Sequence, residues 1–482
     1  MRAALVALLA VLVFSAAGCG SEDVGAGPES PATMLKPGAL VYWETASDPD
    51  GDQWQQVEEL VRRFPDGEKW LAELRAEFEA DSGVTWEEVR NALGDQVGVG
   101  VYAQSAGDAR FVVLLRPEDP DKTIELVNRA NEQSDEEVVA RKVGEWLAIS
   151  DEEASIDAAL KEEGGRALAD VERFSDGMAE LPDDALSRVY VDVGAAVETL
   201  GAADAETARS LEALGLDRLE FAGVWAKARD DGVELAGKLR GEGAEELFGA
   251  TEPYTSELLD LVPEDAFAFM SFSGEGAAER VESLRGNPQF RSAVEEFERE
   301  VGVSLEELVR LFRGEVAFYA APGAPIPELT LLLEADDPAA ARQTAARMLR
   351  SLAEREGGTV TEDGGVTTAS FDGVAVHLGT AADTVVLTTA RGAIDKLGSG
   401  ESLAGSEQYR EALEAAGAPE AYTGLAYVDL AETIELLTGY ASLSGQTVPP
   451  ELLRNLEPLG ALVAYGEQEG DEASALLFVE IQ

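Results

Sequence analysis

The chain has 482 residues, of which 94 are acidic and 37 are Lys or Arg, so its formal net charge is −57, and 45% of it is hydrophobic. This apolar fraction is large enough to form folded cores, whereas the negative charge repels nucleic-acid phosphates and argues against a DNA- or RNA-binding protein. A single His and a single Cys exclude a Cys/His zinc site and an intramolecular disulfide made from the chain's own residues.

The N-terminus predicts an export signal. An apolar run from Ala3 to Phe14 is, at 12 residues, too short for a permanent transmembrane helix of about 20 residues. Small residues then lead to Cys19, a pattern that resembles the bacterial lipobox. The resemblance implies cleavage of a signal peptide, residues 1–18, and attachment of a lipid to the thiol of Cys19. The alternative is an ordinary secretory signal followed by a chance cysteine.

Residues 19–34 begin with the cysteine and continue rich in Gly, Pro, Ser and Glu without periodicity, which predicts a flexible linker. We therefore expect an exported protein, anchored by lipid on Cys19 to the outer face of the bacterial cytoplasmic membrane or to the cell envelope. Because anionic headgroups repel so acidic a body, we expect no further docking on the membrane surface.

The segment DPDGDQWQQVEE, after the first predicted strand, contains the sharpest local motif. Its carboxylates fall at positions 1, 3, 5 and 12, as in an EF-hand calcium loop. Position 6, however, is Gln53 instead of glycine, and a strand rather than a helix precedes the loop. Two hypotheses follow: a calcium site, or a solvated acidic turn at the start of a helix near Trp54. The candidate calcium ligands are Asp48, Asp50, Asp52 and Glu59.

All six tryptophans lie in the first half of the chain. Large apolar residues recur at matching positions of the second half, which predicts core packing for most of them. Trp54 belongs to the acidic loop, which has no counterpart, and is the candidate for stacking against a sugar or another ligand. The matched pairs are Trp43 with Phe269, Trp86 with Leu305 and Trp225 with Tyr465.

Short apolar strands, helices and two-stranded hairpins alternate along the chain. Turn-rich segments such as ARDDG and EQEGDE between apolar runs indicate hairpins, which pair their strands antiparallel. The expected fold class is α+β, internally duplicated, with antiparallel sheets and helices packed on one face. Apolar residues at three- and four-residue spacing predict helices over Trp70–Ala80, Ile124–Gln133, Phe290–Val301 and Ala339–Arg355.

The chain contains an internal duplication. Several short segments of the first half recur in the same order in the second. Their order predicts two related halves, residues 35–241 and 261–482, joined by a connector at residues 242–260, and each half is long enough for its own core. The matching segments include GVTWEEV from Gly83 with GVSLEEL from Gly302, FVVLLRPEDP from Phe111 with LTLLLEADDP from Leu329, and VYVDV from Val189 with AYVDL from Ala426.

No catalytic residue is predicted. Carboxylate pairs such as Glu58–Glu59 could serve a hydrolase, but pairs are expected among 94 acids. His377 has no Cys or second His as a partner, so we expect a structural or exposed role for it. Other acids have helix-start explanations. Asp119–Pro120 and Asp337–Pro338 predict N-caps, and Asp429 with Glu432 predicts a capping box.

The lipobox, the acidic body, the duplicated layout and two Leu-x-Pro openings, Leu35–Pro37 and Leu261–Pro263, resemble the bacterial exported proteins of domain-of-unknown-function family 3352. The resemblance covers most of the mature chain. It implies no reaction, ligand or catalytic residue, because the family has none assigned.

Three functions remain open. No polar arrangement is seen to recur between the halves, which favours a non-catalytic binding or scaffolding module whose partner is an unknown envelope protein. A carrier of a lipid or another apolar ligand, held between sheet and helices, is the second hypothesis. A calcium-assisted or carboxylate hydrolase is the third. Apart from calcium, no cofactor is expected.

Overall fold

The computed structural model describes residues 30–482, except for positions 49, 104–107, 133–136, 243, 245–251, 277–280, 282–287, 325, 372–373 and 444. The predicted signal peptide, residues 1–18, and Cys19 lie outside the described residues. The chain forms two compact units: unit 1 comprises residues 1–243, 450–458 and 481–482, and unit 2 comprises residues 244–449 and 459–480. The units follow the duplicated halves, except that two short C-terminal segments group with unit 1.

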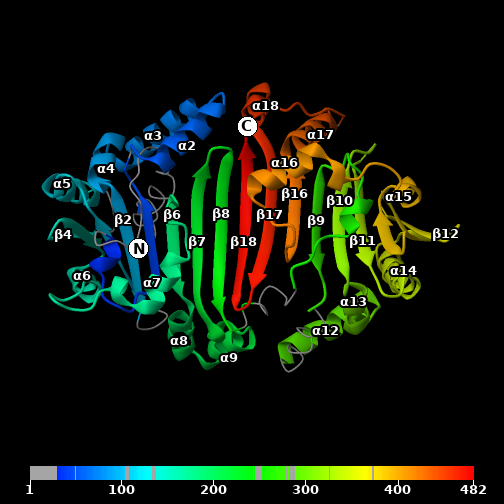
Figure 1. Cartoon of the computed structure of the whole chain (residues 1–482), viewed down its shortest axis with the longest axis horizontal. Coiled ribbons are helices and arrows are strands. Elements are labelled where there is room, and N and C mark those ends of the chain that lie inside the picture. The colour runs from blue at the N-terminus through cyan, green and yellow to red at the C-terminus, as the bar shows by residue number, and fades with distance from the viewer. Residues whose placement is uncertain are drawn as a thin grey trace. The chain divides into compact units, whose positions relative to one another are not determined.

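Unit 1 contains an antiparallel sheet with the strand order β4-β5-β3-β2-β1-β6-β7-β8. The ARDDG segment forms the turn between β7 and β8, the long green hairpin of Figure 1, as predicted. The strands are β1 (Val41–Ala46), β2 (Gln96–Ala103), β3 (Ala109–Leu115), β4 (Val139–Val143), β5 (Trp146–Ser150), β6 (Ser187–Asp192), β7 (Leu219–Arg229) and β8 (Gly232–Gly241).

The helices of unit 1 include those predicted from periodicity. The two expected helices are present as α3 and α5, and α5 begins as predicted, because Asp119 accepts a hydrogen bond from the amide of Lys122 (3.3 Å) ahead of Pro120. The helices are α2 (Asp52–Arg63), α3 (Gly67–Ser82), α4 (Trp86–Leu93), α5 (Pro120–Asn131), α6 (Glu153–Ala159), α7 (Glu172–Ala179), α8 (Val193–Ala203), α9 (Ala205–Ala213) and α18 (Pro450–Leu456), with the 3-10 turns η1 (Pro31–Thr33), η2 (Leu168–Asp170) and η3 (Leu216–Arg218).

Helices cover both faces of the central strands of unit 1. Side chains of β3 alternate between two apolar clusters. Face A, the side that carries Leu114, packs against α6 and α7 through Ile156 and Phe174. Face B, the side that carries Val113, packs against α5 through Ile124. The α+β class is confirmed, and the coverage of both faces extends the expected one-sided packing.

Unit 2 repeats this plan with the strand order β12-β13-β14-β15-β11-β10-β9-β16-β17-β18. Its sheet is antiparallel, with α16 packed on face A through Tyr409 and α14 on face B through Leu349. Its strands are β9 (Ala268–Ser273), β10 (Glu315–Ala321), β11 (Glu328–Glu334), β12 (Thr359–Asp363), β13 (Val366–Phe371), β14 (Val374–Ala381), β15 (Thr384–Thr388), β16 (Gly424–Asp429), β17 (Leu459–Glu469) and β18 (Glu472–Ile481).

The helices of unit 2 also follow the sequence patterns. The two predicted helices are present as α12 and α14, and Asp337 caps α14 by accepting the amide of Ala340 (3.0 Å). Asp429 likewise accepts the amide of Glu432 (2.9 Å) at the start of α17. The helices are α12 (Pro288–Val301), α13 (Leu305–Leu311), α14 (Pro338–Arg355), α15 (Arg391–Lys396), α16 (Glu407–Ala416) and α17 (Leu430–Leu443), with the 3-10 turns η4 (Leu258–Leu261) and η5 (Leu403–Gly405).

The strand registers show which residues of the two units correspond. When the two sheets are aligned through the strand pairs β1–β2 and β9–β10, Tyr42 of unit 1 corresponds to Phe269 of unit 2. Tyr42 is fully buried and Phe269 is 1% exposed. Trp43 then corresponds to Met270. The predicted match of Trp43 with Phe269 is wrong by one residue, and a shift of one residue moves a strand side chain to the opposite face of the sheet.

No helix in the described part of the chain is both long enough and apolar enough to cross a membrane.

Candidate functional site

The acidic loop of unit 1 does not gather its carboxylates. Asp48 accepts a hydrogen bond from the amide of Asp50 (3.2 Å), Asp52 begins α2, and Glu59 lies exposed further along that helix. Over the residues that the structure describes, no group of three or more His, Cys, Asp or Glu side chains is placed to hold a metal ion. The geometry favours the acidic turn, and calcium binding by this loop stays a prediction without a geometric basis.

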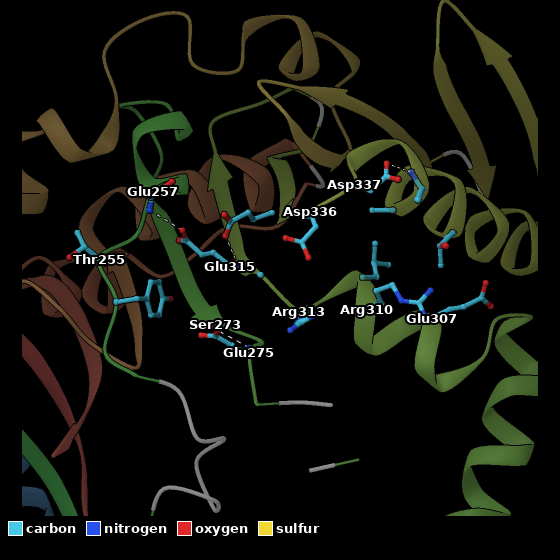
Figure 2. A pocket seen from close by; sticks show the side chains of 18 residues that line it. Thr255, Glu257, Ser273, Glu275, Glu307, Arg310, Arg313, Glu315, Asp336 and Asp337 are labelled. Atoms are coloured by element: carbon cyan, nitrogen blue, oxygen red, sulfur yellow. Dashed lines mark hydrogen bonds between the residues drawn. The ribbon is translucent and has the colours of Figure 1, made fainter. Parts of the chain in front are cut away.

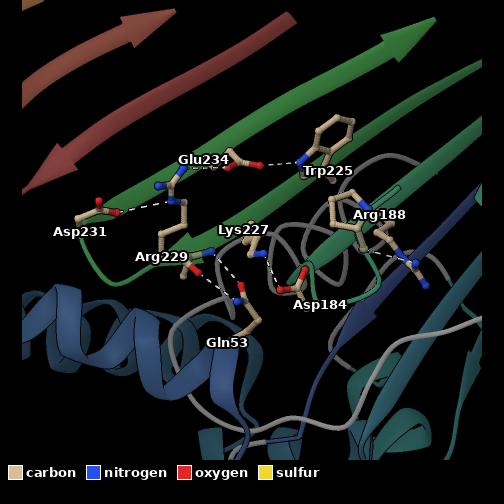
Figure 3. Close-up of polar contacts among 10 residues, drawn as sticks. Gln53, Asp184, Arg188, Trp225, Lys227, Arg229, Asp231 and Glu234 are labelled. Atoms are coloured by element: carbon tan, nitrogen blue, oxygen red, sulfur yellow. Dashed lines mark hydrogen bonds and ion pairs between the residues drawn. The ribbon is translucent and has the colours of Figure 1, made fainter. Parts of the chain in front are cut away.

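Gln53 and Trp54 have structural roles at the end of this loop. The side-chain amide of Gln53 donates to the carbonyl of Ala228 (3.0 Å) and accepts from its N–H (2.8 Å), as Figure 3 shows. These bonds satisfy the backbone N–H and C=O of Ala228, which lies on β7 beyond the last residue that pairs with β6. Trp54 is 4% exposed and donates its indole N–H to the carbonyl of Ala46 (2.9 Å). This burial leaves little of the Trp54 ring open to a ligand, and the ligand-stacking role stays a prediction.

A polar arrangement does recur in both units, contrary to the expectation from sequence. Thr85 and Glu88 form a capping box at the start of α4, and Glu88 also binds Arg129 on α5 (2.6 Å). The Thr85 amide, with Arg129, lowers the pKa of the Glu88 carboxyl to about 2. These contacts join one helix to another, so we assign them a structural role. The equivalent residues at α13 and α14 are Ser304, Glu307 and Arg347.

A buried ion pair lies on face A of unit 1. Glu44 of β1 and Arg188 of β6 have side chains that are 1% and 2% exposed. The hydroxyl of Tyr42 donates to the same carboxylate (2.7 Å). Burial raises the pKa of Glu44, and the Arg188 charge opposes that rise. With no open side, this pair is a structural element.

Unit 2 buries a different carboxylate at its face A. Glu315 of β10 is 6% exposed and accepts hydrogen bonds from the Ser256 hydroxyl and from the amides of Glu257 (2.9 Å) and Leu258 (3.1 Å). Burial raises the pKa of Glu315, and these donors oppose the rise. The carboxylate thereby fixes the chain segment ahead of η4 against the sheet.

His377 lies on β14, where its Nδ1 is 2.9 Å from the hydroxyl of Thr368 on the neighbouring strand. Burial lowers the pKa of this imidazole, and Arg391 adds to that effect. The contact fits the structural role expected for this residue.

An open pocket of about 710 Å³ lies in unit 2 beside Glu315. In the view of Figure 2, Arg313 and Asp336 lie near its middle, with Glu315 on one side and Arg310 on the other. Its walls come from the segment before η4, the end of β9, α13 with the loop to β10, and the start of α14. Seven acids and two arginines line it: Glu257, Glu275, Glu307, Glu315, Glu334, Asp336, Asp337, Arg310 and Arg313.

The second candidate surface is the part of face B in unit 1 that is formed by β6, β7 and β8. Strand alternation places Val189 of β6 and Val224 of β7 on this face, beside Trp43. Three large apolar side chains are open to water: Val224 is 41%, Val233 40% and Leu235 48% exposed. The apolar residues of this surface, which we name apolar face 1, are Val189, Val191, Ala222, Val224, Ala226, Val233, Leu235 and Leu239.

Polar side chains of the same hairpin lie on the opposite face. Trp225 donates its N–H to Glu234 (2.8 Å), and Lys227 binds Asp184 (2.5 Å), as Figure 3 shows. The hairpin therefore turns its paired charges to face A and its aliphatic side chains to face B. An antiparallel strand with one buried face ordinarily shows polar residues to water, so the open apolar side needs an explanation.

Unit 2 carries an equivalent surface, which we name apolar face 2. Its Met270 and Phe272 are 44% and 41% exposed. The pairing of β9 with β16, and of β16 with β17, places further aliphatic residues beside them. Exposed contiguous apolar surface marks a binding site more often than chance exposure does. The residues of apolar face 2 are Met270, Phe272, Ala426, Val428, Leu462 and Ala464.

The sequence analysis did not identify these surfaces. The one available signal was that β7, in the segment LEFAGVWA, has apolar or glycine residues at both alternating sets of positions after Glu220. Such a strand is expected to be buried on both sides. Only the strand pairing, together with the exposure of Val224, shows that the second side stays partly open to water.

Comparisons with known proteins add the family. No curated protein matches the chain. Three solved structures of TP0453, its crystal forms III, IV and I, align with this chain at 13%, 15% and 15% sequence identity. The alignments cover 46%, 49% and 46% of this chain and 80%, 83% and 79% of the TP0453 chains. The TM-score is 0.24 in each case. A family described as "Protein of unknown function (DUF3352)" matches residues 122–478. The chain therefore belongs to the DUF3352 family of proteins of unknown function.

Proposed function

We propose that this protein is an exported, non-catalytic binding protein, anchored by a lipid on Cys19, that holds a neutral acyl ligand against its apolar faces. The observation that carries the proposal is the presence of equivalent, water-exposed apolar faces in both units. Val224 and Leu235 in unit 1, and Met270 and Phe272 in unit 2, are each at least 41% exposed.

The chemistry of apolar face 1 suits an acyl chain. Its side chains are aliphatic, and the Ser187 hydroxyl at its margin already accepts the Trp43 indole N–H (2.6 Å). A ligand that covers this face would gain about 25 cal/mol for each Å² of apolar surface removed from water. The net charge of −57 disfavours an anionic lipid, so a neutral acyl chain is the fitting ligand.

A displacement assay tests ligand binding. The full mature chain is loaded with the neutral dye 1-N-phenylnaphthylamine, which is then displaced with monooleoylglycerol. We expect Leu235→Gln and Met270→Gln each to weaken displacement about fivefold to tenfold, the equivalent of about 1–1.4 kcal/mol. Leu437→Gln on α17, where the side chain is 60% exposed, is the matched control and should change nothing. Equal displacement in all variants would reject the apolar faces as the site.

The anchor is tested separately. Cys19→Ser should move the protein from the membrane fraction to the soluble extracellular or periplasmic fraction, because one lipid-bearing residue holds the chain. Persistent membrane fractionation of this variant would contradict the anchor and leave the ligand assay unaffected.

A further inference from the structure

The pocket of unit 2 differs from the equivalent place in unit 1 in its charged residues. In unit 1, Arg116 forms an ion pair with Asp95 and lies over the ring of Trp146, 5.7 Å from its centre. Glu334 and Gly314 stand at the positions of Arg116 and Asp95, as the register of β10 with β11 shows. The Arg116–Asp95 ion pair of unit 1 therefore has no equivalent in unit 2.

Unit 2 has also gained two arginines at this place. Arg310 and Arg313 occupy the positions of Asn91 and Gly94 in the matching segment. Both side chains are exposed, and no ion pair of either is found among the described residues. Two guanidinium groups on one wall offer several N–H donors in the fork geometry that binds a carboxylate.

Part of the acidic lining is already engaged. Glu307 binds Arg347, Glu315 is held by the segment before η4, and Asp337 caps α14. Asp336 and Glu334 remain exposed at the pocket, although one carboxylate oxygen of Glu334 accepts the amide N–H of Glu315 (2.9 Å). Because seven acids oppose two arginines, the pocket as a whole attracts positive charge while its arginines accept one anionic group.

We infer that this pocket binds a short peptide with an excess of amino groups, with its terminal carboxylate on Arg310 and Arg313 and its amines at Asp336 and Glu334. The volume of about 710 Å³ lies within the roughly 300–1,000 Å³ usual for small-ligand sites and accommodates a tripeptide. This binding is additional to the proposed acyl ligand and does not depend on the apolar faces.

Calorimetric titration of the full mature chain with trilysine, trilysine amide and triglutamate tests the inference. Trilysine should bind about tenfold more tightly than its amide, which lacks the carboxylate, and triglutamate should not bind. Arg310→Asn/Arg313→Gln should weaken trilysine about tenfold and leave the amide unchanged, while Asp336→Asn should weaken both. Arg350→Gln, an exposed arginine of α14 outside the pocket, is the matched control and should bind as the parent does.

The direction in which the double arginine variant changes trilysine affinity distinguishes binding at a specific site from general attraction of a cation to an acidic protein. Removing two positive charges makes the body more negative, so unspecific attraction predicts tighter trilysine binding in the double variant. Tighter or unchanged binding, or equal affinity for trilysine and its amide, would overturn the inference. An unchanged unfolding midpoint verifies that these exposed substitutions leave the fold intact.

Discussion

The two units share their apolar framework but bury different charges. Face A of each unit holds an edge-to-face aromatic pair: Phe174 with Tyr190 in unit 1 (5.1 Å between ring centres) and Tyr409 with Tyr427 in unit 2 (5.0 Å). The buried ion pair of unit 1 has no equivalent, because the matching residues of unit 2 are a serine and a leucine, Ser271 and Leu425.

The comparison shows which positions the fold constrains. Aromatic packing and helix caps are kept, since each shapes a contact between elements. A buried ion pair can be exchanged for uncharged residues, because the cost of removing both charges from water offsets most of their attraction. The same kind of exchange occurs at Glu315: unit 2 buries a carboxylate there, whereas unit 1 has the uncharged Gln96 at the equivalent position.

The largest expected effect comes from breaking the ion pair on one side. Arg188→Leu leaves the Glu44 carboxylate buried without its cation, and we expect the free energy of unfolding of unit 1 to fall by about 3–5 kcal/mol. Denaturant unfolding followed by tryptophan fluorescence reports on unit 1, because all six tryptophans lie in it. The double variant Glu44→Ser/Arg188→Leu, which installs the unit 2 residues, should recover most of the loss. No recovery would contradict the interchangeability of the pair.

Glu315→Ala should have the next largest effect. It removes the acceptor for the Ser256 hydroxyl and the amides of Glu257 and Leu258, and buried donors without acceptors cost about 1–3 kcal/mol. Hydrogen exchange of these two amides should accelerate. The matched variant Gln96→Ala in unit 1 should cost less than half as much, and equal costs would argue against an anchoring role for Glu315.

The helix caps should show equal effects in the two units. Thr85→Ala at α4 and Ser304→Ala at α13 each remove one capping hydroxyl, with an expected loss of about 1 kcal/mol in unfolding free energy. Thermal unfolding of both single variants provides the measurement. A large difference between them would show that the two capping boxes are not equivalent, despite their shared geometry.

The smallest expected effect is on the dependence of the unfolding free energy on pH in the acidic range. The pKa of Glu88 is lowered from 4.5 to about 2, and that of Glu307 is also lowered, so each carboxylate stabilises the folded state above pH 4.5. For Glu88 this contribution is lost as the pH falls from 4.5 through 2, and that of Glu307 is lost as the pH falls below 4.5. Glu88→Gln should flatten the dependence of unfolding free energy on pH over this range and have the same direction of effect as Glu307→Gln. A slope unchanged from the parent would contradict the lowered pKa.

Local patterns predicted most elements of the fold. The four helices expected from apolar spacing are present as α3, α5, α12 and α14, and Asp119 and Asp337 cap α5 and α14 as predicted. Register was predicted less well: the match of Trp43 was one residue off, because a single apolar strand offers two alternating sets of similar side chains. The calcium prediction for the acidic loop has no geometric support among the described residues, since spacing along a chain does not by itself place Asp48 and Glu59 near each other.

The sequence by itself determined the α+β class, the duplication, the caps and the candidate lipid-bearing Cys19, because each depends on residues close in the chain or on a repeated pattern. The tertiary structure decided which carboxylates are buried, where the unit 2 pocket opens and which strand faces stay uncovered. These features depend on strands that pair across long sequence distances, such as β1 with β6. Only that pairing determines whether an apolar side chain meets a helix or water.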